Sequence, residues 1–175
     1  HNAGPMRVGS DGAARSRPGP RHGRGRVAAR VAGSSFGLRS RRVAVKVRHV
    51  KIGGKVSTTM AHVRYLQREG VGSDREPGEA YGRDADSADT QAFAQGCVDD
   101  RHQFRLIVSP EEGAELEDLK DFTRSLMQQM ESDLQTRLDW VAVDHWDTGH
   151  PHTHVLIRGK DQEGSDLLID REYLT

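Results

Sequence analysis

The stretch DWVAVDHWDTGHPHTHVLIRG, residues 139–159, decides the fold of this chain because two apolar runs flank a turn-like segment. Both WVAV and VLI consist mainly of residues that favour buried strands. The segment DTGHP between them is rich in residues that favour turns. The pattern therefore predicts two strands joined as a β-hairpin.

Four of the nine histidines lie in this stretch, three of them on alternate positions. Side chains two residues apart in a strand project from the same face, so His152 and His154 point together. If DTGHP forms the turn, His145 on the preceding strand pairs across to that face and completes a set of three imidazoles. Three neutral imidazoles with open coordination positions are typical of a catalytic metal centre, where water or a phosphate oxygen takes the vacancy. We therefore predict that His145, His152 and His154 bind a metal ion.

Two further polar residues accompany these histidines. His150 shares their alternation but precedes Pro151 in the turn, so we expect it to support a ligand or contact a substrate. Asp147 either accepts a hydrogen bond from an imidazole, which would orient the ring, or caps the turn. The competing interpretation is a set of partly exposed polar side chains on an edge hairpin. It is disfavoured because crowding three imidazoles without a metal costs desolvation and mutual repulsion on protonation.

Similar patterns predict the other strands. Residues 43–52 alternate between valines on one face and the cations Lys46 and Arg48 on the other, which is typical of a strand with a solvated or nucleic-acid-facing side. QFRLIVSP, residues 103–110, is a second strand, ended by its proline. A short strand over DLLI, residues 166–169, follows the turn residues after the hairpin.

Apolar residues at helical spacing predict the helices. The first runs to Gly70, with Ser57 or Thr58 as its N-cap. A short helix covers residues 92–98, and the longest covers residues 111–134. The order of elements predicts an α+β fold in which helices pack on one face of an antiparallel or mixed sheet.

The segment between the first two helices, residues 71–90, is acidic and rich in turn residues. We predict a mobile loop that orders on a ligand, with Tyr81 as a loop aromatic rather than a second nucleophile.

Charge is distributed unevenly along the chain. Residues 1–51 hold 13 of the 26 lysines and arginines but a single acidic residue, so the zero net charge hides a basic beginning and an acidic remainder. Residues 1–41 have almost nothing to bury, so we expect a disordered basic arm, either a linker without a role or a nonspecific contact to nucleic acid. Residues 42–175 are expected to form one domain.

The cysteine count and the hydrophobicity of the sequence indicate the cellular compartment of the protein. The lone Cys97 excludes an intramolecular disulfide. No run approaches the roughly 18 apolar residues of a membrane span, and the N-terminal residues lack the apolar core of a secretory signal. We predict a soluble, cytoplasmic protein without membrane insertion. Because the chain starts at His1 and stops where a helix begins near Asp170, we expect a piece of a longer protein, truncated at its C-terminal end.

The segment HWDTGHPHTHVLIRG, residues 145–159, resembles the third motif of the relaxase/mobilization nuclease family. This family is a branch of the HUH endonucleases, and the resemblance is to its Vir type, which serves conjugative plasmids. The motif reads roughly His-x-Asp-x-x-His-Pro-His-x-His before an apolar strand, and every named position is matched. Only Thr153 departs, because the family prefers a bulky apolar residue there. HVRYLQREG, residues 62–70, resembles the first motif, Tyr-Leu-x-Arg-x-Gly, and QFRLIVSP resembles the second.

The resemblance implies a bacterial enzyme with an RRM-like antiparallel sheet, the HUH endonuclease fold, and a metal site on the face of that sheet. It implies that Tyr65 is the nucleophile, that Asp147 belongs to the catalytic set, and that Ser109 lies near the DNA backbone. The implied cofactor is Mg²⁺ or Mn²⁺, and the implied substrate is single-stranded DNA at an origin of transfer. Relaxosome accessory proteins and the coupling protein of a type IV secretion system are the implied partners.

The implied activity is site- and strand-specific nicking through a 5′-phosphotyrosine intermediate. The backbone of the strand is expected to follow basic side chains, namely Arg48, Arg64, Arg68 and Arg158. Three other functions stay open on the sequence. They are a metal-dependent hydrolase that uses a histidine-bound water, a replication initiator of the same HUH class, and an inactive relaxase fragment that binds DNA without cutting it.

Overall fold

The computed structural model describes residues 43–111, 118–170 and Tyr173, and these form an α+β fold around one sheet. Five strands follow the order β1-β3-β5-β4-β2, and every neighbouring pair is antiparallel. The strands are β1 (Val43–Lys51), β2 (Ala80–Tyr81), β3 (His102–Pro110), β4 (Trp140–His145) and β5 (His152–Arg158). The predicted α+β class with an antiparallel central sheet is confirmed.

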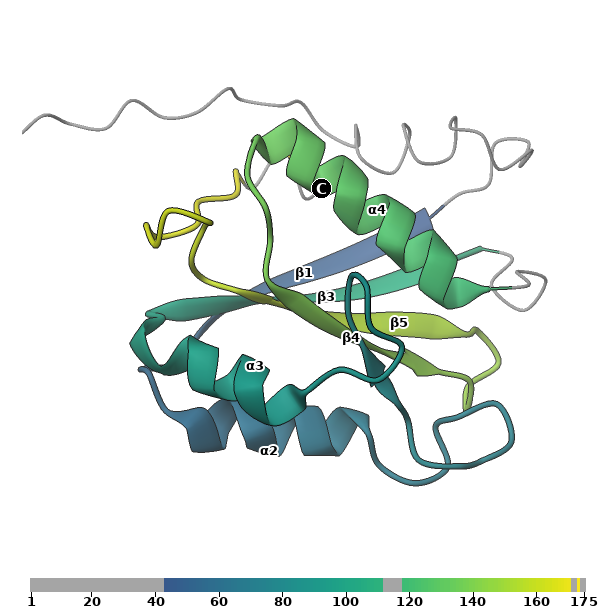
Figure 1. Ribbon diagram of the computed structural model, residues 1–175. Coiled ribbons are helices and arrows are strands. Elements are labelled where there is room, and N and C mark those ends of the chain that lie inside the picture. The colour runs from purple at the N-terminus through teal and green to yellow at the C-terminus, as the bar shows by residue number, and fades with distance from the viewer. Residues whose placement is uncertain (1–42, 112–117, 171–172, 174–175) are drawn as a thin grey trace, which may run out of the picture.

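Helices cover both faces of the sheet (Figure 1). The long helix α4 (Leu119–Leu134) lies on one face, and α2 (Val56–Leu66) and α3 (Thr90–Gly96) lie on the other. A 3₁₀ turn, η1 (Cys97–Asp99), follows α3. The prediction of helices on one face only is therefore wrong. The physical reason is visible in β4, which is buried at five of its six positions and so needs cover on both sides.

Each face of the sheet has its own apolar core. On the α4 side, Phe122 and Leu126 pack in one cluster with Trp140, which faces Ile157 across the β4–β5 pair. On the other side, the α2 residues Val63 and Leu66 belong to a second cluster, whose members also include Phe93, Val141, Val143 and Leu156. Full burial of one such side chain stabilises the fold by about 1.5–3 kcal/mol. The second core holds α2 against the face from which the hairpin histidines project.

Helix α2 starts differently from the prediction. Its N-cap is Lys55, which makes no side-chain capping bond, so the capping role predicted for Ser57 or Thr58 is wrong. Gly53 and Gly54 end β1 with positive φ angles of 59° and 68°. A Cβ on Gly54 would lie 2.2 Å from the Val98 carbonyl oxygen, so only glycine fits there. This tight double-glycine turn fixes where the helix begins, ahead of the hydroxyl residues.

Tyr81 is a core residue and not a loop aromatic, which corrects the prediction. It lies in β2, pairs with Ala142 of β4 and is fully buried. Its hydroxyl donates a hydrogen bond of 2.8 Å to Asp144. A two-residue strand is too short to show periodicity in sequence, so the pattern gave no signal for it.

The segment after β5 also departs from the prediction. In place of a strand over residues 166–169, the structure has one isolated bridge between Lys160 and Asp166. The arm of residues 1–41, the first residues of the helix predicted over 111–134, and most of the helix expected after Asp170 lie outside the described residues. No helix in the described ranges has the length and hydrophobicity needed to cross a lipid bilayer.

Candidate metal centre

The β4–β5 hairpin brings three imidazoles together. His145 is the last residue of β4 and lies opposite His152, the first residue of β5, while His154 lies opposite Val143. All three rings therefore project from the face that α2 and α3 cover. One ring nitrogen of each lies within 4.8 Å of the others, and the ring centroids are separated by 4.4, 5.0 and 5.4 Å.

Backbone carbonyls fix the protons of two of these rings. The Nε2–H of His145 donates to the carbonyl oxygen of Leu66, the last residue of α2, at 2.8 Å. The Nδ1–H of His152 donates to the carbonyl oxygen of His150 at 3.0 Å. Because a carbonyl only accepts, each ring carries its proton on the bonded nitrogen and keeps a lone pair on the other. This is how metal-binding histidines are usually held.

Burial favours the uncharged form of His145 and His154, because it lowers the pKa of both. Desolvation, assisted by the neighbouring histidines, lowers the pKa of His154 to about 3. Desolvation is also the largest cause that lowers the pKa of His145. Neutral imidazoles with free lone pairs are the form that binds metal ions. The residues therefore fit a divalent cation, and a set of three nitrogen donors suits Mn²⁺ better than Mg²⁺, which prefers oxygen.

Tyr65 lies at the C-terminal end of α2, one residue before the carbonyl that holds His145. Its side chain is exposed at 60%, whereas Tyr81 and Tyr173, the other two tyrosines of the chain, are buried. The Tyr65 ring stacks with His62 at a centroid distance of 6.4 Å. One surface tyrosine is thus tied through the backbone to the histidine cluster.

An ion pair also connects α2 to the histidine loop. Arg68 lies 3.2 Å from a carboxylate oxygen of Asp147, and its guanidinium carbon is 4.9 Å from the centre of the Tyr65 ring. The imidazole-orienting role considered for Asp147 is filled by the two backbone carbonyls instead. His150 contributes through its carbonyl, while its side chain is exposed. Asp147 therefore forms an ion pair with Arg68, which lies beside the Tyr65 ring.

The remaining predicted site residues divide by location. Ser109 lies two residues beyond Ile107, which pairs with His154, so both project from the histidine face. Arg48 of β1 is exposed on that same face, and Arg64 is exposed on α2 next to Tyr65.

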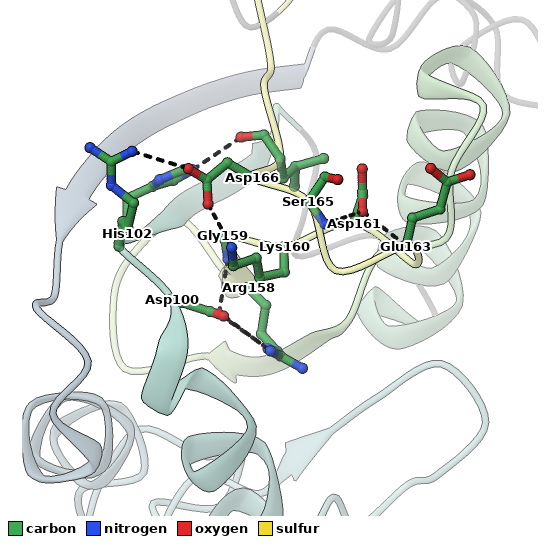
Figure 2. A network of polar contacts seen from close by, with 11 residues as sticks. Asp100, His102, Arg158, Gly159, Lys160, Asp161, Glu163, Ser165 and Asp166 are labelled. Atoms are coloured by element: carbon green, nitrogen blue, oxygen red, sulfur yellow. Dashed lines mark hydrogen bonds and ion pairs between the residues drawn. The ribbon is translucent and has the colours of Figure 1, made fainter. Parts of the chain in front are cut away.

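The structure does not bring Arg158 to this cluster. It lies four residues after His154, about 13 Å along an extended strand. Its guanidinium pairs with the Asp100 carboxylate at 3.0 Å, as Figure 2 shows, and with Asp139 at 3.3 Å. Two acidic partners leave it poorly placed to bind a DNA backbone.

Sequence reasoning missed His62 and Arg105. His62 is half-buried on α2, and burial, together with the charge of Arg105, lowers its pKa to about 4. Its position three residues before Tyr65 places both on one side of a helix, which is the signal that could have identified it. Arg105 gave no such signal, because its surroundings come from distant parts of the chain.

The sheet, its helices and the three-histidine cluster define the chain as an α+β domain with a candidate metal centre on one sheet face. A family model, the nuclease domain of MobA/VirD2-like relaxases, matches residues 67–173. The chain therefore belongs to the MobA/VirD2-like relaxases, and a match to their nuclease domain supports a DNA-nicking endonuclease activity. The matched region includes the histidine cluster and begins two residues after Tyr65. Searches of curated proteins and of solved structures return no match to the chain.

Proposed function

We propose that this chain nicks single-stranded DNA at an origin of transfer, with Tyr65 as the nucleophile. The observation that supports this most directly is the hydrogen bond from His145 to the Leu66 carbonyl. It joins the metal centre to the residue after Tyr65, so the exposed phenol and the histidine cluster are parts of one rigid unit. Relaxosome accessory proteins and a type IV secretion coupling protein are the partners that this function requires.

The residues fit a transesterification. His145, His152 and His154 would hold the divalent ion. When bound, that ion supplies Lewis-acid stabilisation of the charge on the nonbridging oxygens of the scissile phosphate. The Tyr65 oxygen forms a bond to phosphorus, and the bond from phosphorus to the 3′ oxygen breaks. The phenolic proton ends on that oxygen, so the products are a 5′-phosphotyrosine and a free 3′-hydroxyl.

Because the step exchanges one phosphodiester for another, a 3′-hydroxyl can reverse it and rejoin the strand. The Arg68 guanidinium lies over the Tyr65 ring and forms an ion pair with Asp147. We assign both residues to positioning the tyrosine. Ser109, Arg48 and Arg64 lie where they can contact the DNA backbone, and a single strand suits the site since its phosphorus must reach the tyrosine free of a stacked duplex.

The test is a denaturing gel of the protein incubated with Mn²⁺ or Mg²⁺ and single-stranded origin-of-transfer oligonucleotides labelled at the 3′ end. The label should migrate with the wild-type protein and be lost in Tyr65→Phe. The matched control is Tyr81→Phe, which removes the hydroxyl of a tyrosine buried in the core. It should keep the adduct, although the lost hydrogen bond to Asp144 lowers stability by about 1 kcal/mol.

Other outcomes separate the competing functions. Cleaved product without a protein adduct, unaffected by Tyr65→Phe, would identify a hydrolase that uses a histidine-bound water. Bound but intact DNA with every oligonucleotide and both metals would identify a DNA-binding fragment without nuclease activity.

A further inference from the structure

Arg105 of β3 differs from every other partly buried arginine that the structure describes. The others each pair with a carboxylate, and they are Arg68, Arg83, Arg124 and Arg158. Within the described ranges, no carboxylate lies within ion-pair distance of Arg105. Its Nε–H donates to the side-chain oxygen of Gln103 at 3.1 Å, a neutral partner. Burial of a charge without an opposite charge is costly, so this arrangement needs a reason.

The position of Arg105 suggests that reason. It pairs with Leu156 in the β3–β5 ladder, two residues from the pair of Ile107 with His154, so its side chain shares the histidine face. Its charge also lowers the pKa of His62 on α2, after the larger effect of burial. Arg105 therefore borders both the metal centre and the helix that carries Tyr65.

Two more cations continue from Arg105 to the edge of the sheet. Arg48 of β1 lies directly opposite Arg105, and Lys46 lies opposite Ile107. Both are exposed. Like charges on directly opposed strand positions destabilise a sheet. We call these three residues, Lys46, Arg48 and Arg105, the cationic stripe. An anionic ligand along the stripe would offset this repulsion.

We propose that Arg105 binds a phosphate of the DNA strand next to the scissile phosphate, and that the strand leaves the metal centre over the cationic stripe. This rests on the proposed function, because the strand is the one that Tyr65 cuts. Gln103 holds the guanidinium through Nε, which leaves the two terminal nitrogens to donate to two phosphate oxygens. Arg48 and Lys46 then receive the following phosphates.

The test measures DNA binding without cleavage. Fluorescence anisotropy follows a labelled single-stranded oligonucleotide of mixed sequence in the presence of EDTA, with wild type, Arg105→Gln and Arg101→Gln. Arg101→Gln is the matched control, because it removes the same charge from an exposed side chain that pairs with Asp166. Arg105→Gln should weaken binding by at least on the order of tenfold, since it removes hydrogen bonds to a charged group. It should also reduce the slope of log affinity against log salt by about 0.7.

Arg101→Gln should change the affinity by less than about twofold and leave the salt slope nearly unchanged, as expected for a surface charge away from the strand. Equal effects of the two variants would overturn the proposal, as would a wild-type protein that binds no single-stranded DNA. Circular dichroism melts check that each variant folds. Should Arg105→Gln fail to fold, Arg105→Lys decides, because it keeps the charge and loses the planar fork. Weaker binding by that variant supports the phosphate contact, and unchanged binding contradicts it.

This experiment and the adduct experiment can fail separately. A tyrosine adduct, together with DNA binding that does not depend on Arg105, would support the proposed nuclease and contradict the phosphate site at Arg105. DNA binding that depends on Arg105, without any protein adduct, would support the phosphate site and contradict the assignment of Tyr65 as the nucleophile.

Discussion

His62 lies on α2, the helix that carries Tyr65, and is close enough to the sheet for the charge of Arg105 to act on it. Its ring stacks with Tyr65, and its pKa is lowered to about 4, first by burial and then by the charge of Arg105. His154 experiences the charge of His62 in turn. A protonated His62 would place a second positive charge beside Arg105 in a partly buried position, so the folded chain favours the neutral ring.

A pH-dependent stability follows from that lowered pKa. The ordinary histidine pKa of 6.5 applies to the unfolded chain, so between pH 6.5 and about 4 the unfolded state binds more protons at this residue. Stability from neutral His62 is present above pH 6.5 and is lost as the pH falls. In EDTA, His62→Gln should therefore make Tm fall less steeply over this range than in wild type. His150→Gln, which changes an exposed histidine, is the control, and identical slopes for wild type and His62→Gln would contradict the assignment.

The sequence predicts the residues of the metal centre better than their supports. Alternation within a strand and one hairpin suffice to bring His145, His152 and His154 together, because both are local properties. The carbonyl that holds His145 belongs to Leu66, 79 residues away in the chain. A sequence does not reveal which backbone carbonyl will meet a given side chain. Nor does it reveal that Arg105 has no acidic partner among the described residues, because that depends on the whole sheet. Such long-range supports appear only when the chain is folded.

At the level of elements, α2 and α4 begin in different ways. The N-cap of α4 is Asp118, whose carboxylate accepts hydrogen bonds from the backbone N–H groups of Lys120 and Asp121 at 2.7 and 3.1 Å. The N-cap of α2 is Lys55, with no side-chain bond and no acidic residue in the first turn. Sequence identifies such elements by their apolar spacing, but their ends depend on adjacent turns.

Opposite effects on stability are expected at these two caps. Asp118→Ala should lower the free energy of unfolding by about 1 kcal/mol, because two backbone donors lose their acceptor. Lys55→Asp should raise it by roughly 0.5–1 kcal/mol, since a carboxylate there can cap the helix and favours its dipole. Urea denaturation measures both. Equal destabilisation by the two substitutions would show that the start of α2 is fixed by the double-glycine turn alone.

Across the whole molecule, the two ends of β5 are joined to the rest of the fold by different means. At one end, Asp100 accepts hydrogen bonds from the Arg158 guanidinium and from the Gly159 backbone N–H (Figure 2). At the other end, the histidines connect β5 to β4 and, through Leu66, to α2. The first end is held by an ion pair within the chain. The second end has three imidazoles whose ring nitrogens face one another, so a bound cation would add to the stability of the whole fold.

Metal binding should therefore raise the melting temperature. A hundredfold excess of Mn²⁺ over its Kd contributes about 2.7 kcal/mol to stability, which is on the order of ten degrees for a domain of this size. Mg²⁺ at the same concentration should shift Tm less, because imidazole nitrogen is a poorer ligand for it. His154→Gln should abolish the Mn²⁺ shift, and EDTA should reverse it in wild type. His49→Gln, which changes a histidine on the opposite face of the sheet, should keep the shift. If Mn²⁺ stabilised the His154 variant as strongly as wild type, the ion would bind outside the three-histidine centre.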